Sequence, residues 1–319
     1  MTTTHAWTTV RVIAARPVAD GVLELRLGAD EPLPRWSAGA HLEVETASGI
    51  RQYSLCGDPA DDAWTIAVLR EDAGRGGSLH LHTSAAVGSE LRVRGPRNHF
   101  ALVPDADDYV LVAGGIGITP LKAMARELQA EGRPWRLHYG GRSAASMAYV
   151  DDLRALAPDR VQVVPQDEAG LLDLDDILAD AAGGTVVYCC GPSGLLDAAA
   201  VAVAASPARE LHVERFSGSG VPDPETDDAP GEGFVVELAA SGLEVEVGPG
   251  ESILEAVRAC LPDVMSSCED GYCGTCETPV LDGVPEHRDT VLSPSEQDAN
   301  DTMMICVGRS RTPRLVLDL

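Results

Sequence analysis

Four cysteines towards the C-terminal end have the spacing of ligands to an iron–sulfur cluster. They follow the pattern C-x4-C-x2-C, with a fourth cysteine after 29 intervening residues: Cys268, Cys273, Cys276 and Cys306. This is the plant-type spacing for four thiolates that bind a [2Fe–2S] cluster, which carries single electrons. A zinc site, which more often shows paired C-x2-C motifs, and a disulfide set, which needs an oxidising compartment, are the alternatives. The spacing favours electron transfer.

Two glycines lie between the first three cysteines, in the segment CEDGYCGTC. Gly271 and Gly274 allow the backbone to turn tightly, so that amide N–H groups can point at sulfur atoms that carry negative charge. Three ligands would then come from one loop and the fourth from a distant part of the chain.

A glycine loop follows an apolar strand in the middle of the chain. The strand 109–112 runs into AGGIGITP, residues 113–120, after which apolar residues recur with helical spacing. We expect Thr119 to cap this helix and Pro120 to occupy its first turn, so that unpaired N–H groups face the loop. A pyrophosphate could bind there, although the loop lacks the G-x-G-x-x-G pattern and a tight turn without a ligand is the alternative.

A second glycine turn ends another apolar strand, TVVYCC. Cys190, Gly191 and Pro192 come directly after it. In an open α/β sheet, ligands bind outside the carboxyl ends of the strands, so two such turns in one sheet favour a dinucleotide site. Cys190 taken alone is more typical of a buried, apolar position.

Two segments near the N-terminal end combine the groups that bind phosphate. The strand that ends in Arg51–Ser54 carries an arginine and hydroxyl groups, and GRGGS at 74–78 adds backbone amides. Arginine, hydroxyls and glycine amides suit a phosphate group. An ordinary strand with an exposed arginine is the alternative.

The composition is strongly acidic, which excludes several classes of partner. Asp and Glu number 50 against 24 Lys and Arg, for a formal net charge of −26. Such a charge repels nucleic acid and anionic membranes, so we expect neither as a partner. Residues 233–319 hold 16 acidic and 5 basic side chains. They would steer a partner with a basic patch, unless they form a merely solvated surface.

We expect a cytoplasmic protein that works as a monomer. The sequence has no run of 18 apolar residues, and its start, MTTTHAWTTV, lacks the features of a signal peptide. The other cysteines show no disulfide spacing, which suits a reducing compartment.

Changes in composition and in the pattern of apolar residues divide the chain into four parts. Residues 1–103 alternate apolar and polar in short runs, which predicts an antiparallel barrel or sandwich. Residues 104–216 alternate apolar strands with helical segments, which predicts five parallel strands with crossover helices. Residues 217–232, rich in Gly, Pro and acid, are typical of a linker. The cysteine pattern lies in the remaining part, 233–319.

Taken together, several motifs resemble the phthalate dioxygenase reductase family, within the ferredoxin–NADP reductase superfamily. They are RQYSLCGDP, GRGGS, RGPRNHF, AGGIGITP, YGGRS, CCGP, HVERF and the four cysteines, in this order along the chain. The resemblance implies a multidomain protein. An antiparallel β-barrel would bind flavin, a five-stranded parallel α/β domain would bind the nucleotide, and a β-grasp ferredoxin domain would hold the cluster.

The resemblance also implies roles for individual residues on the flavin side. Arg51 would meet the flavin phosphate, Tyr53 would pack on the isoalloxazine ring, and Ser54 would hydrogen-bond near flavin N5. A second phosphate-binding turn would consist of Gly76, Gly77 and Ser78.

On the nucleotide side, the resemblance implies a larger set. The nicotinamide nucleotide would be lined by Gly114, Gly115, Gly117 and Thr119. The nicotinamide would be bordered by Cys190, Gly191 and Pro192, and Phe216 would stack at the flavin. The adenosine half would be contacted by Arg142 and Ser143. The residues expected at the reacting atoms are Ser54, Cys190 and Phe216.

The implied activity is electron transfer from NADH to FMN to the [2Fe–2S] cluster and on to a terminal oxygenase. A nicotinamide yields two electrons together whereas the cluster takes one, so a flavin is needed between them. FMN is favoured over FAD because the barrel is short, and NADH over NADPH by family habit. We expect the reductase component of a two-component Rieske oxygenase, ring-hydroxylating or O-demethylating. A cytochrome P450 partner is the alternative, and a zinc-stabilised, non-catalytic interaction protein is an alternative of another class.

Overall fold

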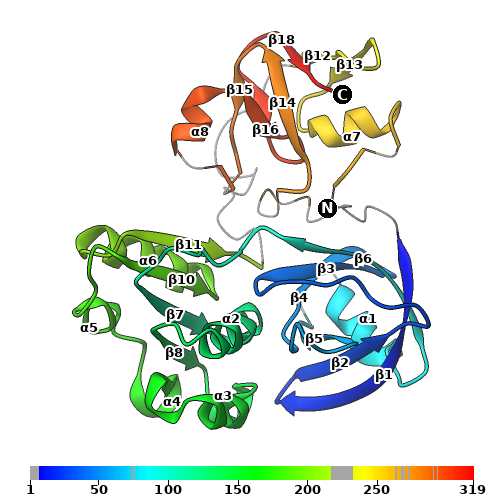
Figure 1. Cartoon of the computed structure of the whole chain (residues 1–319). Helices are drawn as coiled ribbons and strands as arrows, with labels where there is room; N and C mark the ends of the chain where they lie inside the picture. Colours follow the sequence, from blue (N-terminus) through cyan, green and yellow to red (C-terminus); the bar gives the residue numbers. More distant parts are fainter. Residues whose placement is uncertain are drawn as a thin grey trace. The chain divides into compact units, whose positions relative to one another are not determined.

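The computed structural model describes residues 7–72, 74, 76–216, 233–262, 264–266, 269, 271, 274–289, 291–292 and 294–319. The chain forms two compact units, Met1–Phe216 and Ser217–Leu319 (Figure 1). The barrel predicted for 1–103 and the α/β domain predicted for 104–216 belong to the same unit. The predicted linker, 217–232, lies outside the described residues, as do Cys268 and Cys273.

Six antiparallel strands form the barrel of the first unit. They are β1 (Thr8–Ala19), β2 (Val22–Gly28), β3 (Ala40–Thr46), β4 (Gly49–Ser54), β5 (Trp64–Leu69) and β6 (Glu90–Asn98), in the order β4-β3-β6-β1-β2-β5. A bridge between Leu55 and Ile66 joins the two edge strands. Alternate apolar side chains fill the interior, and helix α1 (Gly77–Ser84) adds Leu81 to this core.

Five parallel strands form the second part of this unit. They are β7 (Asp108–Gly114), β8 (Trp135–Gly141), β9 (Val161–Pro165), β10 (Thr185–Cys190) and β11 (Glu210–Glu214), in the order β11-β10-β7-β8-β9. Helices cover both faces: α2 (Ile118–Ala130), α3 (Val150–Leu156), α4 (Gln166–Ala169), α5 (Leu174–Leu178) and α6 (Ser193–Ala205). Short 3-10 turns are η1 (Gly115–Gly117), η2 (Ala144–Ser146) and η3 (Pro158–Arg160).

Helix α2 packs against both the parallel sheet and the barrel. Along β7, Tyr109, Leu111 and Ala113 share one core with this helix, whereas the alternate residues face α5 and α6. The same core includes Cys56 and Ala67 of the barrel part. Figure 1 shows α2 between β7 and the barrel strands. This helix therefore sets how the two parts of the first unit meet.

The second unit has a mixed sheet with one helix against it. Its strands are β12 (Phe234–Leu238), β13 (Leu243–Val247), β14 (Glu277–Asp282), β16 (Thr302–Met304) and β18 (Arg314–Leu317), in the order β13-β12-β18-β14-β16. Strands β12 and β18 are parallel, and their neighbours are antiparallel. Helix α7 (Ile253–Arg258) begins at a capping box of Ser252 and Glu255. The remaining elements are β15 (Pro285–Glu286), β17 (Arg309–Ser310) and α8 (Pro294–Ala299).

The antiparallel barrel, the parallel five-stranded sheet and the mixed sheet of the second unit agree with the predicted fold class. Among the helices in the described part of the chain, none combines the length and hydropathy needed to cross a membrane.

A carboxylate is fully buried on β3, beside two arginines of β6. Arg94 Nε lies 2.5 Å from Glu43 Oε2, and Arg97 Nη1 lies 3.3 Å from Glu43 Oε1. Two residues further along β3, Glu45 makes an exposed pair with Arg92. A buried carboxylate is tolerated only because charged hydrogen bonds replace its water, so Glu43 and its arginines act as one group.

Removing Glu43 should therefore destabilise the barrel much more than removing Glu45. We expect Glu43→Ala to lower the free energy of unfolding by about 3 kcal/mol, because two mostly buried guanidiniums lose their shared carboxylate. The matched change Glu45→Ala should cost less than about 1 kcal/mol. Urea unfolding of the two variants measures both values, and equal losses would contradict the buried arrangement.

Candidate functional site

Arg51 lies against the N-terminus of α1, where the sequence predicts a phosphate site. Its Nη1 and Nη2 donate to the carbonyls of Ile50 and Ser48, at 2.7 and 2.9 Å. A Cβ added to Gly77 would lie 2.6 Å from Arg51 Cγ, so only glycine allows this approach. The first turn of α1 contains no acidic residue. Helix N–H groups and a guanidinium thus gather in one place, which fits the phosphate of a flavin nucleotide.

The turn before α1 depends on two further predicted residues. Gly76 is the N-cap residue and has φ +83°, a conformation that favours glycine. Ser78 Oγ accepts a hydrogen bond from the Glu71 amide at 3.0 Å. The structure therefore brings Gly76 and Gly77 to Arg51, whereas the oxygen of Ser78 already closes its own loop.

The end of β4 approaches the end of β11 through one side-chain hydrogen bond. Ser54 Oγ donates to Glu214 Oε2 at 3.2 Å, across 160 positions of sequence. Burial raises the pKa of Glu214 to about 8, which the bond from Ser54 only partly opposes, so this carboxyl is protonated at neutral pH. Burial also raises the pKa of Tyr53, the residue before Ser54, to about 12. The predicted flavin strand therefore ends at a proton held between Ser54 and Glu214.

Sequence reasoning missed Glu214. The residue lies within HVERF, two positions before Phe216, so it was inside a motif already singled out. A carboxylate at the end of a strand, next to an arginine, is usually solvated, and only the three-dimensional contact with Ser54 distinguishes Glu214.

The two glycine turns of the parallel sheet contact each other backbone to backbone. A Cβ added to Gly117 would lie 2.1 Å from the Cys190 carbonyl oxygen, and one added to Gly191 would lie 2.9 Å from Gly114 Cα. A Cβ added to Gly114 would lie 2.7 Å from Pro192 Cδ. Strands β7 and β10 are neighbours, which places the turns side by side. The close approach explains the glycines and leaves their amides at the carboxyl edge of the sheet.

The start of α2 differs from the prediction. Gly117 is the N-cap, and Thr119 lies inside the helix, where its Oγ1 donates to the Ile116 carbonyl at 2.9 Å. Thr119 as the capping residue was therefore wrong, because the 3-10 turn of Gly115–Gly117 leads directly into α2. Pro120 lies in the first turn, as expected. Gly115 has φ +55° and no atom within 4 Å of an added Cβ, so open space remains at this helix end.

The other predicted nucleotide residues lie at the same edge. Arg142, which is exposed, and Ser143, which caps η2, follow β8. Phe216 follows β11 and is 37% exposed. Cys190 is fully buried, and burial together with the Glu214 charge raises the pKa of its thiol well above the usual value. Strand ends β8, β7, β10 and β11 thus gather these residues, with a neutral thiol among them.

Two of the four predicted cluster ligands are described, and the sheet brings them together. Cys276 precedes β14 and Cys306 follows β16, which pair in the register Glu277 with Met304. The amide of Ile305 donates to the Cys276 carbonyl at 3.4 Å. Both cysteines are buried. Antiparallel pairing therefore places two thiols, separated by 29 residues in sequence, at one end of the sheet.

The loop glycines adopt the conformations expected of a tight turn. Gly271 and Gly274 have φ +70° and +73°. A Cβ on Gly271 would lie 2.6 Å from Val307 Cγ2, next to Cys306. The glycine between the ligands thus packs closely beside the fourth cysteine, which fits a compact cluster loop.

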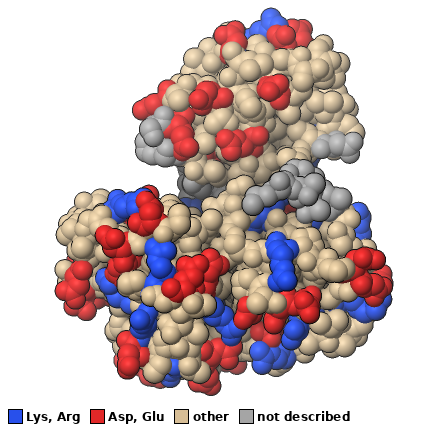
Figure 2. Space-filling view, viewed as in Figure 1, with Lys and Arg blue, Asp and Glu red and all other residues tan. Residues whose placement is uncertain are grey.

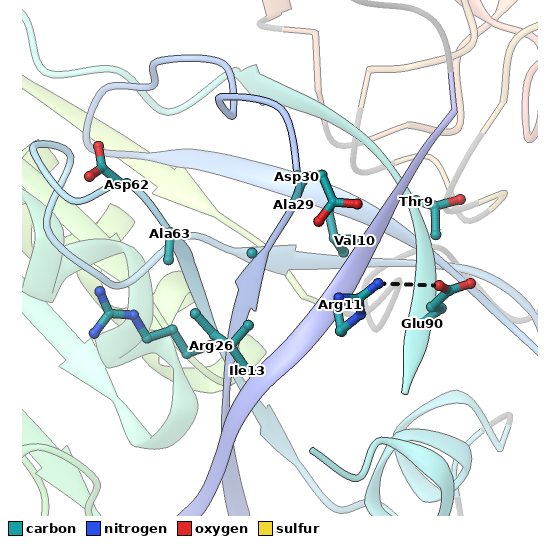
Figure 3. Close-up of a pocket in the computed structure, with 11 residues that line it drawn as sticks. Thr9, Val10, Arg11, Ile13, Arg26, Ala29, Asp30, Asp62, Ala63 and Glu90 are labelled. Atoms are coloured by element: carbon teal, nitrogen blue, oxygen red, sulfur yellow. Dashed lines mark ion pairs between the residues drawn. The ribbon is translucent and has the colours of Figure 1, made fainter. Parts of the chain in front are cut away.

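A pocket of about 530 Å³ lies elsewhere, at the surface of the barrel (Figure 3). Arg11 of β1 and Glu90 of β6 approach to 3.9 Å at its wall, and Arg26 of β2 with Asp30 and Asp62 supply further charges. The pocket is lined by β1, β2 and nearby residues, and so lies apart from the end of β4 and the edge of the parallel sheet.

The protonated carboxyl of Glu214 predicts a pH dependence of stability. Its pKa is about 8 in the folded protein against 4.5 for the ordinary side chain, so the folded state holds an extra proton between these values. The free energy of unfolding, relative to Glu214→Gln, should fall as pH rises through this window, by on the order of 2 kcal/mol for a partly exposed group. Urea unfolding at pH 5 and pH 9 measures this; a constant difference would contradict the raised pKa.

Comparison with known proteins covers both units. The family "Dimethylamine monooxygenase subunit DmmA-like, N-terminal domain" matches residues 89–211, and "2Fe-2S iron-sulfur cluster binding domain" matches residues 236–310. The phenoxybenzoate dioxygenase subunit beta of Ectopseudomonas oleovorans is 46% identical, over 99% of this chain and 98% of that protein.

Two solved structures extend the comparison to the whole fold. An intact type IV self-sufficient cytochrome P450 monooxygenase is 46% identical with a TM-score of 0.87; the match covers 98% of this chain but 41% of that one, so this chain spans less than half of the P450 protein. Phthalate dioxygenase reductase is 34% identical with a TM-score of 0.72, over 98% of both chains. Sequence and fold agree over the full length, and the chain therefore belongs to the phthalate dioxygenase reductase family of flavin- and [2Fe–2S]-containing oxidoreductases.

Proposed function

We propose that this chain takes electrons from NADH through FMN and its [2Fe–2S] cluster and delivers them singly to a terminal oxygenase. The observation that carries the proposal is the Ser54–Glu214 hydrogen bond. It joins the end of the predicted flavin strand to the carboxyl edge of the predicted nucleotide sheet, so the two cofactor sites meet inside one compact unit.

The chain's part in the first step is to bind and orient. Arg51, Gly76 and Gly77 would hold the flavin phosphate at the N-terminus of α1, and Tyr53 would supply an apolar, uncharged ring to the flavin. The glycine turns that contain Gly117 and Gly191 present backbone amides to the nucleotide phosphates. FMN, when bound, accepts the electron pair of a hydride and passes electrons on singly.

Neutral side chains surround the point where the two sites meet. At neutral pH Glu214 holds a proton, and Ser54 donates its own proton to Oε2. The Cys190 thiol is buried and neutral as well. Phe216 is partly exposed at the end of this edge, and its ring would stack at the flavin. These groups exclude water and avoid a fixed negative charge that would repel an anionic dinucleotide.

The cluster would be held by Cys276 and Cys306, at the end of the β14–β16 pair, together with Cys268 and Cys273. Gly271 keeps the loop compact beside the fourth ligand. The proposal of four thiolates rests on the plant-type spacing and on the close approach of the two described segments.

The partner that we favour is the terminal component of a Rieske-type oxygenase, because the similar full-length proteins include reductases of dioxygenase systems. A cytochrome P450 is the second candidate, because the P450 monooxygenase contains a region 46% identical to this chain. Figure 2 shows acidic side chains over the visible face of the second unit. They would attract a basic docking surface on either partner. Reducing each purified oxygenase with this protein and NADH distinguishes the two.

We place this reaction in the cytoplasm, where NADH is available. The thiols of Cys56, Cys189 and Cys190 are buried and free, as expected in a reducing compartment. We propose a monomer as the working form.

The glycine contact predicts the effect of one added methyl group. Gly117→Ala forces the two turns apart, because its Cβ would lie 2.1 Å from the Cys190 carbonyl oxygen. We expect NADH-dependent flavin reduction to fall by on the order of 10- to 100-fold in kcat/KM. Gly183→Ala is the control, since nothing lies within 4 Å of its added Cβ at the other end of β10. Stopped-flow measurement of flavin reduction gives both rates. A wild-type rate for Gly117→Ala would refute the role of the two glycine turns in binding the nucleotide.

The order of electron transfer predicts that loss of the cluster leaves flavin reduction intact. Cys306→Ala should lose the iron content and the broad visible absorption of the cluster, and so the reduction of cytochrome c as a one-electron acceptor. Reduction of the flavin by NADH should remain within about twofold of wild type, because its residues lie in the other unit. Cys260→Ala serves as the control outside the ligand pattern. A colourless wild-type protein with stoichiometric zinc would instead support the zinc-stabilised interaction protein.

A further inference from the structure

Lys122 is the only lysine in the chain, and it is buried where α2 meets the barrel. The residue is 4% exposed. Its Nζ donates to the Cys56 carbonyl at 2.9 Å and lies 4.1 Å from the centre of the Tyr149 ring. Asp152 Oδ2 lies 3.9 Å away. A carbonyl from the barrel part and a ring and a carboxylate from the α/β part therefore share one ammonium group.

The two ends of this contact belong to the two cofactor sites. Cys56 comes two residues after Ser54, which donates to Glu214 at the point where the sites meet. Lys122 lies in the second turn of α2, five residues after Gly117, whose backbone touches the Cys190 carbonyl. One hydrogen bond thus ties the predicted flavin strand to the helix that begins at the nucleotide turn.

The surroundings of the ammonium group are themselves held in place. Tyr149 has φ +65°, which a bulky side chain adopts only where the surroundings require it. Its ring lies beside Lys122 Nζ, and its hydroxyl lies 3.5 Å from Cys56 Sγ. Behind it, Glu24 of β2 accepts from Arg16 of β1 at 2.6 Å. The barrel and the α/β part therefore meet at a buried polar network with a defined geometry.

Stability alone is a weak reason for such an arrangement. Burial lowers the pKa of Lys122, which reflects the cost of taking an ammonium group out of water. Replacing buried charges by apolar residues of similar volume is often neutral or stabilising. What a buried charge adds is geometric: the ammonium group is satisfied only when the two parts of the unit are in one relative position.

We propose that Lys122 is a positioning residue for hydride transfer, because its bond to the Cys56 carbonyl sets the distance between the flavin strand and the nucleotide turn. The inference rests on the proposed function, in which NADH is oxidised to NAD⁺ and the same electron pair reduces FMN. Small displacements of reacting groups change such rates strongly, so loss of the tie acts on the rate of transfer more than on binding.

The test is Lys122→Met in the full-length holoprotein, which keeps the length and apolar bulk of the side chain but removes the charge and the donor. Anaerobic stopped-flow with NADH gives the limiting rate of flavin reduction and the Kd of NADH separately. We expect the limiting rate to fall by about 10- to 100-fold and the Kd to change less than about threefold. The long-wavelength absorption of reduced flavin stacked on NAD⁺ should weaken in parallel, because it depends on the same spacing.

Leu128→Ala is the matched control, on the same helix and fully buried, but away from the ammonium group. It should lower the melting temperature without lowering the limiting rate. If both variants lose rate in proportion to their melting temperatures, or if Lys122→Met reduces its flavin at the wild-type rate, the positioning role is overturned.

Asp152→Asn decides the question if Lys122→Met does not fold, since Asp152 is 44% exposed and tolerant of change. A fall in the limiting rate that is smaller than the one expected for Lys122→Met, with the Kd of NADH unchanged, supports the proposal. A wild-type limiting rate overturns it. Failure of the proposed function is a separate result: the wild-type protein itself would then show no flavin reduction by NADH.

Discussion

The close approach of the Gly117 backbone to the Cys190 carbonyl is the constraint on which the first unit depends. An added Cβ would overlap that carbonyl, so β7 and β10 can end side by side only if their turns lack side chains. The contact determines where α2 begins, and α2 carries both Lys122 and Glu127, whose carboxylate accepts from the Ala38 amide of the barrel part. The position of the barrel relative to the nucleotide edge therefore follows from a contact between glycine turns.

The charge state of the same region follows from burial. Glu214 and Cys190 are both kept neutral, the first as a carboxylic acid at neutral pH and the second as a thiol. A chain with a net charge of −26 repels anions at long range. At these strand ends, however, neither Glu214 nor Cys190 carries a negative charge at neutral pH. In the proposed function, an anionic dinucleotide would meet helix N-termini and backbone amides there instead. Burial thus removes negative charge at these strand ends, although the chain as a whole is strongly acidic.

Patterns that depend on local chemistry could be predicted from the sequence. The alternation of apolar strands with helical segments predicted the parallel sheet. The comparisons confirm the family that the motifs indicated. The roles of individual site residues, including those of Arg51 and Phe216, stay predictions. Thr119 as the helix cap was wrong because nothing local shows that a 3-10 turn precedes α2. Glu214 and Lys122 were missed as functional residues because their partners, Ser54 and Cys56, lie far away in sequence.

The absence of any second lysine has a practical consequence for chemical probing. Apart from this lysine and the histidines, the basic side chains are arginines, which do not react with reagents for ε-amines. Because the one ε-amine lies buried between the barrel and the α/β part, attachment of a dye or support through lysine can proceed only when these parts separate. The extent of such labelling then reports directly how often the flavin-side and nucleotide-side halves of this unit open.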